Sequence, residues 1–421
     1  MLHMDSSKNN SHHDVIVIGG GPAGATVSTL IAQKGFEVRL FERAKFPRFH
    51  IGESLIPETY WVLERLNMLD KMRKSPFVKK YSVQFANQHG KVSEPFYFTE
   101  HRPHECSQTW QVLRSEFDQM MLDNACEHGV KAEEGVRVRE VLFEGDRAVG
   151  VKVQYEDGKV EDVFARVVVD ASGQTALIGN KFNILKKDAD LKKGAVWTYW
   201  KGAYRDKGRD EGATMVLQTK GKTGWFWYIP LHNNIVSVGI VRGFAEMFAG
   251  NRDHETIYNE ELDNCPEVKR RVSMGTRCDK FYATKDYSYR AERSAGDGWV
   301  LVGDAYGFLD PLYSSGVLLA LKSGQLAADA IVEGLMANDL SGDRLGKWAP
   351  DFCQGMDRMR RLVLEYYEGF SFGRFVKSYP DFKGHLTDLL IGDLFNDHVE
   401  EVFPRIDKLK QEAVAAQAAT E

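Results

Sequence analysis

The sequence has little cysteine, and the cysteines that it has do not cluster. Five are spread over 421 residues, none belongs to a C-x-x-C pair, and their number is odd: Cys106, Cys126, Cys265, Cys278 and Cys353. A disulfide framework or a cysteine-ligated metal site needs paired spacing, so we predict neither. Free thiols are typical of a reducing compartment, and we expect a cytoplasmic protein without a metal.

Long apolar runs and an excess of charge of one sign are also lacking. The longest apolar runs, such as residues 317–321, are far shorter than the roughly 18 residues that a membrane span needs. The 55 Lys and Arg nearly balance the 60 Asp and Glu, which excludes bulk electrostatic binding of nucleic acid. Residues 1–13 are polar and lack the apolar core of a signal peptide, so we predict a disordered lead there. The expected partners are small molecules or proteins.

Glycine, by contrast, is plentiful, and its most ordered cluster follows the first predicted strand. A strand at residues 15–18 runs into a G-x-G-x-x-G motif at residues 19–24, a helix begins at Pro22, and the next strand ends at Glu42. Glycines in this order permit a tight turn, close approach of the backbone to a pyrophosphate, and packing of helix on strand. The helix N-terminus attracts phosphates, and the acid accepts from ribose hydroxyls. An acid here disfavours a 2′-phosphate, so the sequence predicts NAD or FAD.

A second element decides between these dinucleotides. Residues 299–305 read as a strand that ends in Gly303-Asp304-Ala305, far along the chain from the first motif. A distant turn of this kind is needed when the ligand is long, and FAD extends past its pyrophosphate through a ribityl chain whose hydroxyl group Asp304 would hold. Together with residues 112–118 and 170–173, the two motifs resemble the FAD-binding aromatic hydroxylase superfamily. We expect FAD to bind at Gly19, Gly21, Ala23, Gly24, Glu42, Arg43, Arg114, Gly303, Asp304, Pro311 and Gly316.

The order of the predicted elements indicates an α/β fold with a discontinuous cofactor domain. A Rossmann-like FAD-binding domain is expected from residues 14–80, 105–190 and 290–335. An inserted antiparallel β-sheet on the substrate side is expected from residues 81–104 and 191–289, where short runs are rich in Trp, Tyr and Val. Residues 336–421 are read as a C-terminal helical region. Within the first segment, residues 54–68 are read as a helix.

Three stretches narrow the family. Trp225-Phe-Trp227-Tyr-Ile229-Pro230 matches the W-x-W-x-I-P signature of flavin-dependent halogenases, residues 308–316 resemble their F-x-x-P-x-x-S-x-G signature, and residues 52–57 resemble their G-E-S-x-x-P turn. The similarity runs from about residue 14 to about residue 335, and the C-terminal helices match less well. The second signature is partly shared with prenyl reductases and other flavoproteins.

This resemblance implies a reaction in two stages. Reduced FAD and O2 give a C4a-hydroperoxide, which oxidises chloride or bromide to hypohalous acid, and a lysine then presents that acid to an electron-rich aromatic ring. Residues 77–81 resemble the family segment with this lysine, and Lys80 is the aligned candidate, with Lys79 as the alternative. A lysine in a buried apolar site would hydrogen-bond hypohalous acid or form a chloramine.

The same resemblance assigns residues to the halide and to the tunnel. Ser315 and Gly316 precede a helix, and their N–H groups would cradle a halide, hold flavin O2, or do both. Trp225 and Trp227 are two residues apart and face one side of a strand, where with Pro230 they would separate flavin from substrate. Core packing explains their spacing equally well.

One departure bears on the substrate. Tryptophan halogenases carry a glutamate three residues before Gly316, and this sequence has Tyr313 there. Its absence resembles the phenol- and pyrrole-type halogenases, whose substrates activate themselves, either free or bound to a carrier protein. The resemblance also implies that a separate flavin reductase supplies reduced FAD, and the chain would act as a monomer or homodimer.

Three other functions remain open at this point. A flavin monooxygenase that hydroxylates an aromatic ring needs the same FAD motifs but neither the tryptophan pair nor the lysine. A prenyl-chain reductase shares the Asp-Pro-Leu element that begins at Asp310 and needs a long apolar tunnel. A flavin-binding protein without turnover would need only the FAD motifs.

Overall fold

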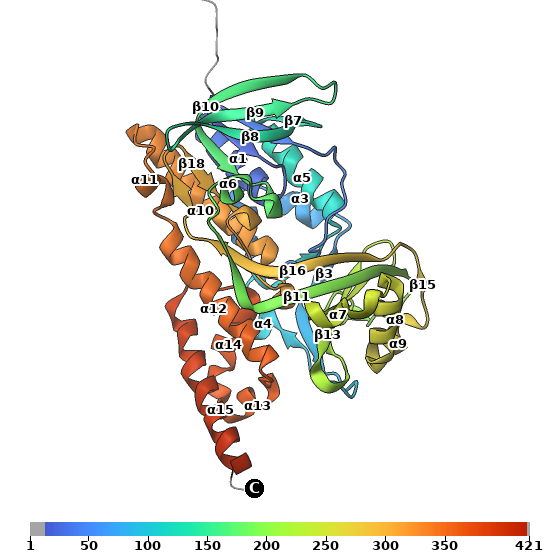
Figure 1. The fold of residues 1–421 in the computed structure, drawn as a ribbon. Helices are drawn as coiled ribbons and strands as arrows, with labels where there is room; N and C mark the ends of the chain where they lie inside the picture. Colours follow the sequence, from blue (N-terminus) through green and yellow to red (C-terminus); the bar gives the residue numbers. More distant parts are fainter. Residues whose placement is uncertain (1–12, 419–421) are drawn as a thin grey trace, which may run out of the picture.

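The structure is a computed structural model that describes residues 13–418. The predicted lead at residues 1–13 lies outside the described residues, except for His13, which opens strand β1 (His13–Ile18). The chain forms two large sheets, one above the other in Figure 1, and a column of C-terminal helices runs along their side.

The first sheet has the strand order of a doubly wound nucleotide-binding fold. Parallel strands follow one another in the order β7-β2-β1-β10-β18, so the chain starts in the middle and moves first to one edge and then to the other. Their bounds are β2 (Val38–Glu42), β7 (Lys131–Glu134), β10 (Val160–Asp170) and β18 (Trp299–Leu301). Strand β17 (Ala295–Gly296) pairs antiparallel at one edge, and the hairpin β8 (Arg137–Glu144) and β9 (Arg147–Gln154) extends from β10.

Three helices cover this sheet where the cofactor motifs lie. Helix α1 (Pro22–Ala32) contacts both α5 (Arg114–Glu127) and α10 (Gly316–Ala337). Nearly every residue of α1 is buried, because sheet and helices enclose it on all sides. The central strands read as continuous Val and Ile runs for the same reason: a parallel sheet is covered on both faces.

The second sheet is antiparallel except for one parallel pair, and its order is β19-β16-β11-β14-β13-β12-β4-β5. The bounds are β4 (Ser82–Ala86), β5 (Phe96–Tyr97), β11 (Leu185–Lys201), β12 (Thr214–Gln218), β13 (Gly224–Leu231), β14 (Ile235–Gly243), β16 (Tyr282–Ala291) and β19 (Gly307–Phe308), with β15 (Thr276–Arg277) paired to β11.

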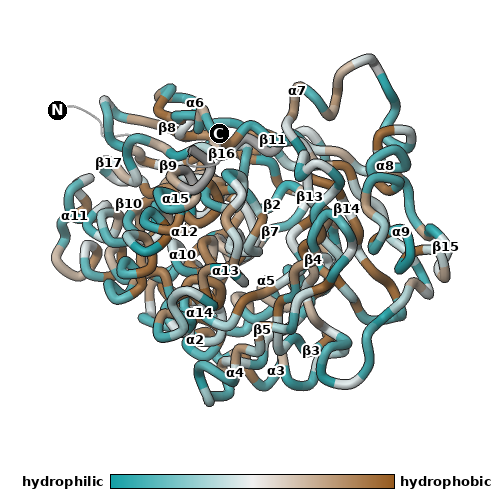
Figure 2. The backbone as a smooth tube through the Cα atoms, turned by 90° about the horizontal axis from the view of Figure 1, so that it is seen from below, coloured by the Kyte–Doolittle hydropathy of each residue, from teal (hydrophilic) through white to brown (hydrophobic). Residues whose placement is uncertain are grey.

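Strand β13 shows why both faces of this sheet are apolar. Trp225 and Trp227 belong to the core shared with the first sheet, whereas Phe226 and Tyr228 belong to a separate core beneath helices α8 (His254–Asp263) and α9 (Pro266–Val272). The brown, hydrophobic stretches of Figure 2 accordingly lie inside both halves of the molecule. The predicted common face of the two tryptophans is confirmed.

The remaining helices and strands are short or lie at the C-terminal end. The short ones are α2 (Thr59–Arg65), α3 (Leu69–Lys74), β3 (Val78–Lys80), α4 (Phe98–His101), β6 (Thr109–Gln111), α6 (Leu177–Lys181), α7 (Phe244–Met247) and α11 (Gly342–Gly346). The C-terminal region consists of α12 (Ala349–Tyr367), α13 (Phe372–Ser378), α14 (Lys383–Ile391) and α15 (Val402–Ala418). Among residues 13–418, no helix has the length and apolar character that crossing a membrane requires.

The predicted fold class is confirmed, with one local correction. Residues 54–58 and 66–68 are not helical as predicted: Ser54 forms a β-bridge with Gln111, and α2 spans only Thr59–Arg65, with Asn67 at a positive φ of 59° just after it. Backbone hydrogen bonds with Trp110 and Val112 hold Glu53 and Leu55 beside β6, and residues 56–58 form a turn before α2 begins. The division of the chain into domain segments stays a proposal, and strand β11 runs without a break across the expected boundary between residues 190 and 191.

Candidate active site

The glycine-rich turn between β1 and α1 is as tight as its sequence predicts. Gly19 has φ of +102°, and a Cβ atom there would lie 2.5 Å from the carbonyl oxygen of Ala171. A Cβ atom on Gly24 would lie 1.9 Å from the carbonyl oxygen of Gly19. Neither position admits another residue, and the turn leaves the first N–H groups of α1, at Ala23 and Gly24, without helical partners.

Glu42 closes this turn from the end of β2. Its carboxylate accepts hydrogen bonds from the backbone N–H of Gly20 and of Ala44, each at 2.8 Å, and its side chain is almost fully buried. The carboxylate is thereby fixed beside the glycines, and each oxygen keeps a free lone pair for a ribose hydroxyl. Arg43, the next residue, is exposed, and its predicted contact with the cofactor stays a prediction.

The second cofactor motif lies against the first, although the two are far apart in sequence. Gly303 has φ of +58°, and a Cβ atom there would lie 2.8 Å from Cβ of Ala23 in α1. The next residue, Asp304, is partly buried, and desolvation raises the pKa of its carboxyl group to about 6, although the charge of Arg114 opposes this.

Arg114 is buried, and its guanidinium group is taken up by hydrogen bonds to other residues of the protein. Its Nε and Nη2 donate to the two oxygens of Asp118 at 2.7 and 3.0 Å, and its Nη1 donates to the carbonyl oxygen of Ile51 at 2.8 Å. Arg114 therefore holds the turn at residues 51–52, and its predicted contact with the cofactor stays a prediction. Arg48, which the sequence analysis missed, also pairs with Asp118 and reaches to 3.4 Å from the Cβ position of Gly21, where a pyrophosphate would be expected.

These features fit FAD. A glycine cradle, a fixed acid, a cation at the cradle and a second acid on a distant turn are the groups that a long dinucleotide requires. Near these cofactor motifs, α10 begins at Gly316. A Cβ atom on Gly316 would have no neighbour within 4 Å, so there is open space at this helix start. Ser315, just before it, is buried, and its hydroxyl oxygen has no hydrogen-bond partner among residues 13–418. Pro311 starts the short 3₁₀ turn that leads to both.

The tryptophan pair is buried, and each indole N–H is satisfied. The ring centroids of Trp225 and Trp227 are 6.4 Å apart. Trp227 donates to the hydroxyl of Ser237 at 3.1 Å, and a Cβ atom on Gly239 would lie 2.2 Å from its ring. Pro230, further along β13, is buried as well. Trp225 and Trp227 form a buried wall on one face of β13, whereas Pro230 stands at a strand position that faces the other side. The role of all three toward a tunnel stays a prediction.

Lys80 and Lys79 lie in very different surroundings. Both belong to β3, where Lys79 is exposed and Lys80 is only 2% exposed. The ammonium nitrogen of Lys80 donates to Ser54 Oγ and to the carbonyl oxygen of Leu55, both at 2.9 Å, and lies 5.7 Å from the centroid of the Phe98 ring. No carboxylate pairs with it among the described residues, and desolvation lowers its pKa to about 7.

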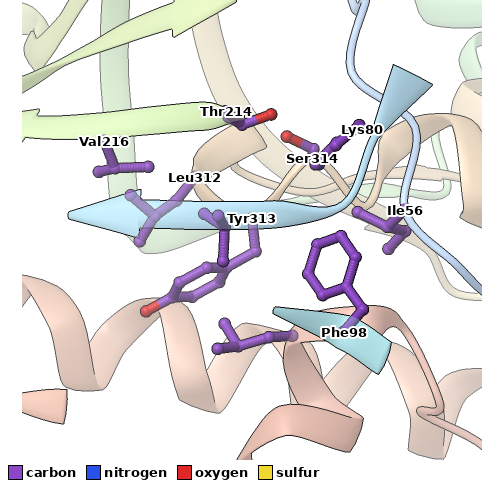
Figure 3. A pocket seen from close by; sticks show the side chains of 10 residues that line it. Ile56, Lys80, Phe98, Thr214, Val216, Leu312, Tyr313 and Ser314 are labelled. Carbon is purple, nitrogen blue, oxygen red and sulfur yellow. The ribbon is translucent and has the colours of Figure 1, made fainter. Parts of the chain in front are cut away.

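A small pocket joins Lys80 to the turn that leads into α10. Figure 3 shows Lys80, Thr214 and Ser314 on one side of this pocket and the rings of Tyr313 and Phe98 on the other. The full lining consists of Ile56, Lys80, Val83, Phe98, Thr214, Val216, Leu312, Tyr313, Ser314 and Leu390. Apart from Lys80 and the hydroxyl groups, this lining is apolar.

The structure thus brings Lys80 beside the segment that holds Pro311, Ser315 and Gly316, as the sequence analysis requires. Sequence reasoning missed Ser54 and Thr214, which contact or neighbour Lys80, and also Phe98 and Leu390. Ser54 belongs to the G-E-S-x-x-P turn, so its place in that motif was the available signal. Phe98 and Leu390 carry no signal, since an apolar residue in a short helix reads as core packing.

The fold and the cradle define a FAD-binding flavoprotein of the doubly wound class with an added antiparallel sheet. The family model of tryptophan halogenases matches residues 14–116 and 99–369, so the chain belongs to this family of flavin-dependent halogenases. These enzymes use FAD, with halide as co-substrate.

Individual relatives agree with this assignment. The chain is 34% identical over 388 residues to a 1H-pyrrole-2-carbonyl-(peptidyl-carrier protein) brominase of Pseudoalteromonas luteoviolacea, with 91% of this chain and 93% of the relative covered. It is 36% identical over 363 residues to a tryptophan 2-halogenase of Chondromyces crocatus, with 84% and 67% covered. The solved structure of the flavin-dependent brominase Bmp2 superposes with a TM-score of 0.85 at 28% identity and covers 96% of this chain and 100% of that one.

Proposed function

We propose that the enzyme halogenates a phenol or a pyrrole, free or bound to a carrier protein, with Lys80 as the residue that presents the halogenating agent. One observation carries the proposal: the amino group of Lys80 is buried without a carboxylate partner and faces the same pocket as the turn before α10. Bound reduced FAD, with O2 and halide, supplies hypohalous acid.

The hydrogen bonds of Lys80 leave one direction of its nitrogen for that agent. Two N–H groups point to Ser54 and to the carbonyl of Leu55, so a neutral amine would present its lone pair to the pocket and an ammonium its third N–H. Because desolvation lowers the pKa to about 7, a large neutral fraction exists near pH 7. The neutral form can bind hypohalous acid as a hydrogen-bond acceptor or attack its halogen.

Ser315 and Gly316 are proposed to hold the halide. The buried hydroxyl of Ser315 lacks a hydrogen-bond partner within the described part of the chain, and the first N–H groups of the 22-residue helix α10 lie beside it. An anion at this point would be stabilised by the helix N-terminus. The buried pair Trp225 and Trp227 is proposed to keep the substrate from the flavin.

The lining of the pocket favours a substrate whose aromatic ring is already activated by its own heteroatom. Tyr313 lines it with an aromatic ring, and its hydroxyl is turned away toward the carbonyl oxygen of Leu362 at 3.4 Å. No carboxylate lines the pocket, so charge on the ring must be delocalised through the substrate's own heteroatom. The similarity to a carrier-protein pyrrole brominase supports this class, whereas the similarity to a tryptophan 2-halogenase makes tryptophan the competing substrate.

A single assay tests the proposal. Purified enzyme is incubated with FAD, a flavin reductase, NADH, O2 and bromide, and a panel of phenols, pyrroles and tryptophan is read by mass spectrometry. A gain of bromine on phenols or pyrroles supports the proposal. A gain of oxygen instead would identify a monooxygenase, and bromine on tryptophan alone would overturn the substrate class. Omission of the reductase tests the proposed need for that separate partner.

A further inference from the structure

The hydroxyl groups of Ser54 and Thr214 form a continuous hydrogen-bonded line with Lys80. Lys80 Nζ donates to Ser54 Oγ at 2.9 Å, and Ser54 Oγ lies 2.8 Å from Thr214 Oγ1. The amide nitrogen of Gln111 then reaches Thr214 Oγ1 at 2.8 Å. All four side chains are at least nine-tenths buried, and they come from four separate segments of the chain.

Chemistry fixes the direction of most of these bonds. The amide of Gln111 also contacts the carbonyl oxygen of Gly212 at 2.9 Å, and a carbonyl only accepts, so the amide must present its NH₂ group to both neighbours. Thr214 therefore accepts from Gln111, and Ser54 accepts from Lys80. The hydroxyl hydrogen of Ser54 has one acceptor within reach among the described residues, which is Thr214. In the opposite orientation the buried Ser54 hydrogen would be unpaired, at a cost of about 1–3 kcal/mol. Thr214 lines the pocket, so in the favoured orientation its own hydrogen can turn into that space.

The oriented hydroxyls determine where the amino group points. With its hydrogen committed to Thr214, Ser54 turns its lone pairs to Lys80, and the carbonyl of Leu55 takes the second N–H. Two of the three free directions of the nitrogen are then fixed, and the third faces the pocket that Thr214 also lines. A four-carbon side chain without these partners would sample several rotamers.

We propose that Ser54 and Thr214 are positioning residues for Lys80: together they hold its amino group toward the pocket and set its protonation. This inference rests on the proposed function in so far as Lys80 presents the halogenating agent. Three neighbouring titratable groups each have a hydrogen-bond or ion-pair partner other than Lys80. Glu53 accepts from Tyr199, Glu58 pairs with Arg102, and Tyr313 donates to Leu362.

Isosteric variants test the proposal. Thr214→Val keeps the shape and removes the hydroxyl, Ser54→Ala removes the direct acceptor, and Thr214→Ser restores a hydroxyl. Thr198→Val is the matched control, because Thr198 is a fully buried threonine whose hydroxyl donates to the carbonyl oxygens of Asp279 and Lys280, which do not line the pocket. Thermal denaturation establishes that each variant is folded before it is assayed.

Two readouts are compared in the holoenzyme. We expect Thr214→Val and Ser54→Ala to lower the yield of halogenated product per reduced flavin at least about tenfold, with Thr214→Ser within about twofold of wild type. Loss of an acceptor destabilises the ammonium form, so the pKa of Lys80, followed by NMR of ¹³Cε-labelled lysine, should fall and move the acid limb of the pH profile to lower pH. The control should change neither quantity.

The outcomes separate this inference from the proposed function. If Thr214→Val and Ser54→Ala keep the wild-type yield and the wild-type titration of Lys80, the positioning role is wrong even though the enzyme halogenates. If Lys80→Ala still halogenates, the proposed relay is wrong, and the NMR titration alone still decides whether the two hydroxyls control the amino group.

Discussion

The indole N–H of Trp225 donates a 2.9 Å hydrogen bond to the hydroxyl of Tyr367, the last residue of α12. That hydroxyl in turn donates to Oδ2 of Asp310 at 2.9 Å, and Asp310 precedes the turn that carries Pro311 and Ser315. The second sheet, the C-terminal helices and the turn before α10 are thus tied together at one phenol group. Desolvation raises the pKa of the buried Asp310 carboxyl group, and its bond from Tyr367 opposes this.

Replacement of Tyr367 by phenylalanine should therefore weaken the packing of the wall formed by Trp225 and Trp227, while FAD still binds. A buried N–H and a buried carboxylate each lose a partner, so we expect the free energy of unfolding to fall by about 1–3 kcal/mol. The share of NADH consumption that ends as free peroxide should rise. Tyr379→Phe serves as the control, since the hydroxyl of Tyr379 makes no hydrogen bond within the described part of the chain. Equal stability of the two variants in urea titrations would contradict the coupling.

Lys80→Ala should abolish halogenation and leave NADH-dependent flavin oxidation intact, because the flavin cradle does not include this lysine. Lys79→Ala is the matched control one residue away, on the exposed side of β3. Product formation and oxygen consumption are measured in parallel. Halogenation by Lys80→Ala at near wild-type rate, or its loss in Lys79→Ala, would move the role to Lys79.

Two buried groups should give the folded state opposite pH dependences in separate ranges. Desolvation lowers the pKa of Lys80 from 10.5 to about 7, so the unfolded chain binds more protons between these values and stability rises with pH there. Desolvation raises the pKa of Glu53 from 4.5 to about 7, so the folded chain binds more protons and stability falls as pH rises through that lower range.

Variants assign each range to its residue. Unfolding free energies of wild type, Lys80→Met and Glu53→Gln are measured from pH 4.5 to 10.5. As pH rises from 7 to 10.5, the wild type should gain stability relative to Lys80→Met. As pH rises from 4.5 to 7, the wild type should lose stability relative to Glu53→Gln. If the difference in unfolding free energy between wild type and a variant does not vary with pH in the range of that residue, the pKa of the residue is not shifted in the folded state.

Phe372 should limit the size of the substrate. Its ring stacks on Phe85 with centroids 4.7 Å apart and meets the edge of Tyr313 at 6.1 Å, directly behind the pocket. Phe372→Ala should therefore raise the rate on two-ring phenols relative to one-ring phenols by about tenfold or more. Phe375, fully buried on the same helix, packs on Phe370 and Tyr379 instead, so Phe375→Ala should leave this ratio unchanged.

The substrate class can be tested by side-by-side rates on tryptophan and a simple phenol. Without a carboxylate at Tyr313, nothing stabilises the charge that develops on a weakly activated indole ring. Loss of one charged contact to the transition state commonly costs on the order of 3 kcal/mol, roughly a hundredfold in rate. We expect phenol to be favoured by about this factor, and faster halogenation of tryptophan would reverse the assignment.

Local patterns were sufficient to predict the nucleotide fold, because glycines at a tight turn and a fixed acid leave few alternatives. Gly19, Gly24 and Glu42 lie where their spacing required. The surroundings of Lys80 could not be predicted in this way. Ser54, Thr214 and Leu390 meet only after two sheets and the C-terminal helices have packed, and each alone reads as an ordinary core or turn residue.

The helical prediction for residues 54–68 failed at its start for a related reason. The apolar spacing there suits a helix, but Ser54 and Leu55 have backbone partners on β6 that local sequence does not reveal. Arg48 and Arg114 illustrate the same limit in electrostatic terms. Both meet Asp118, whose position depends on how α5 packs.

The family model ends at residue 369, yet Leu390 beyond it lines the Lys80 pocket, and Phe372 packs behind Tyr313. Most of the pocket lining, including Lys80 and Tyr313, comes from the matched part of the chain, and the C-terminal helices add one side of it. Substitutions confined to α13 and α14 are therefore expected to change the shape of this side of the pocket while the flavin cradle, built from other elements, stays intact. Chimeras joined at Gly369 are the natural starting point for redirecting this enzyme to new aromatic compounds.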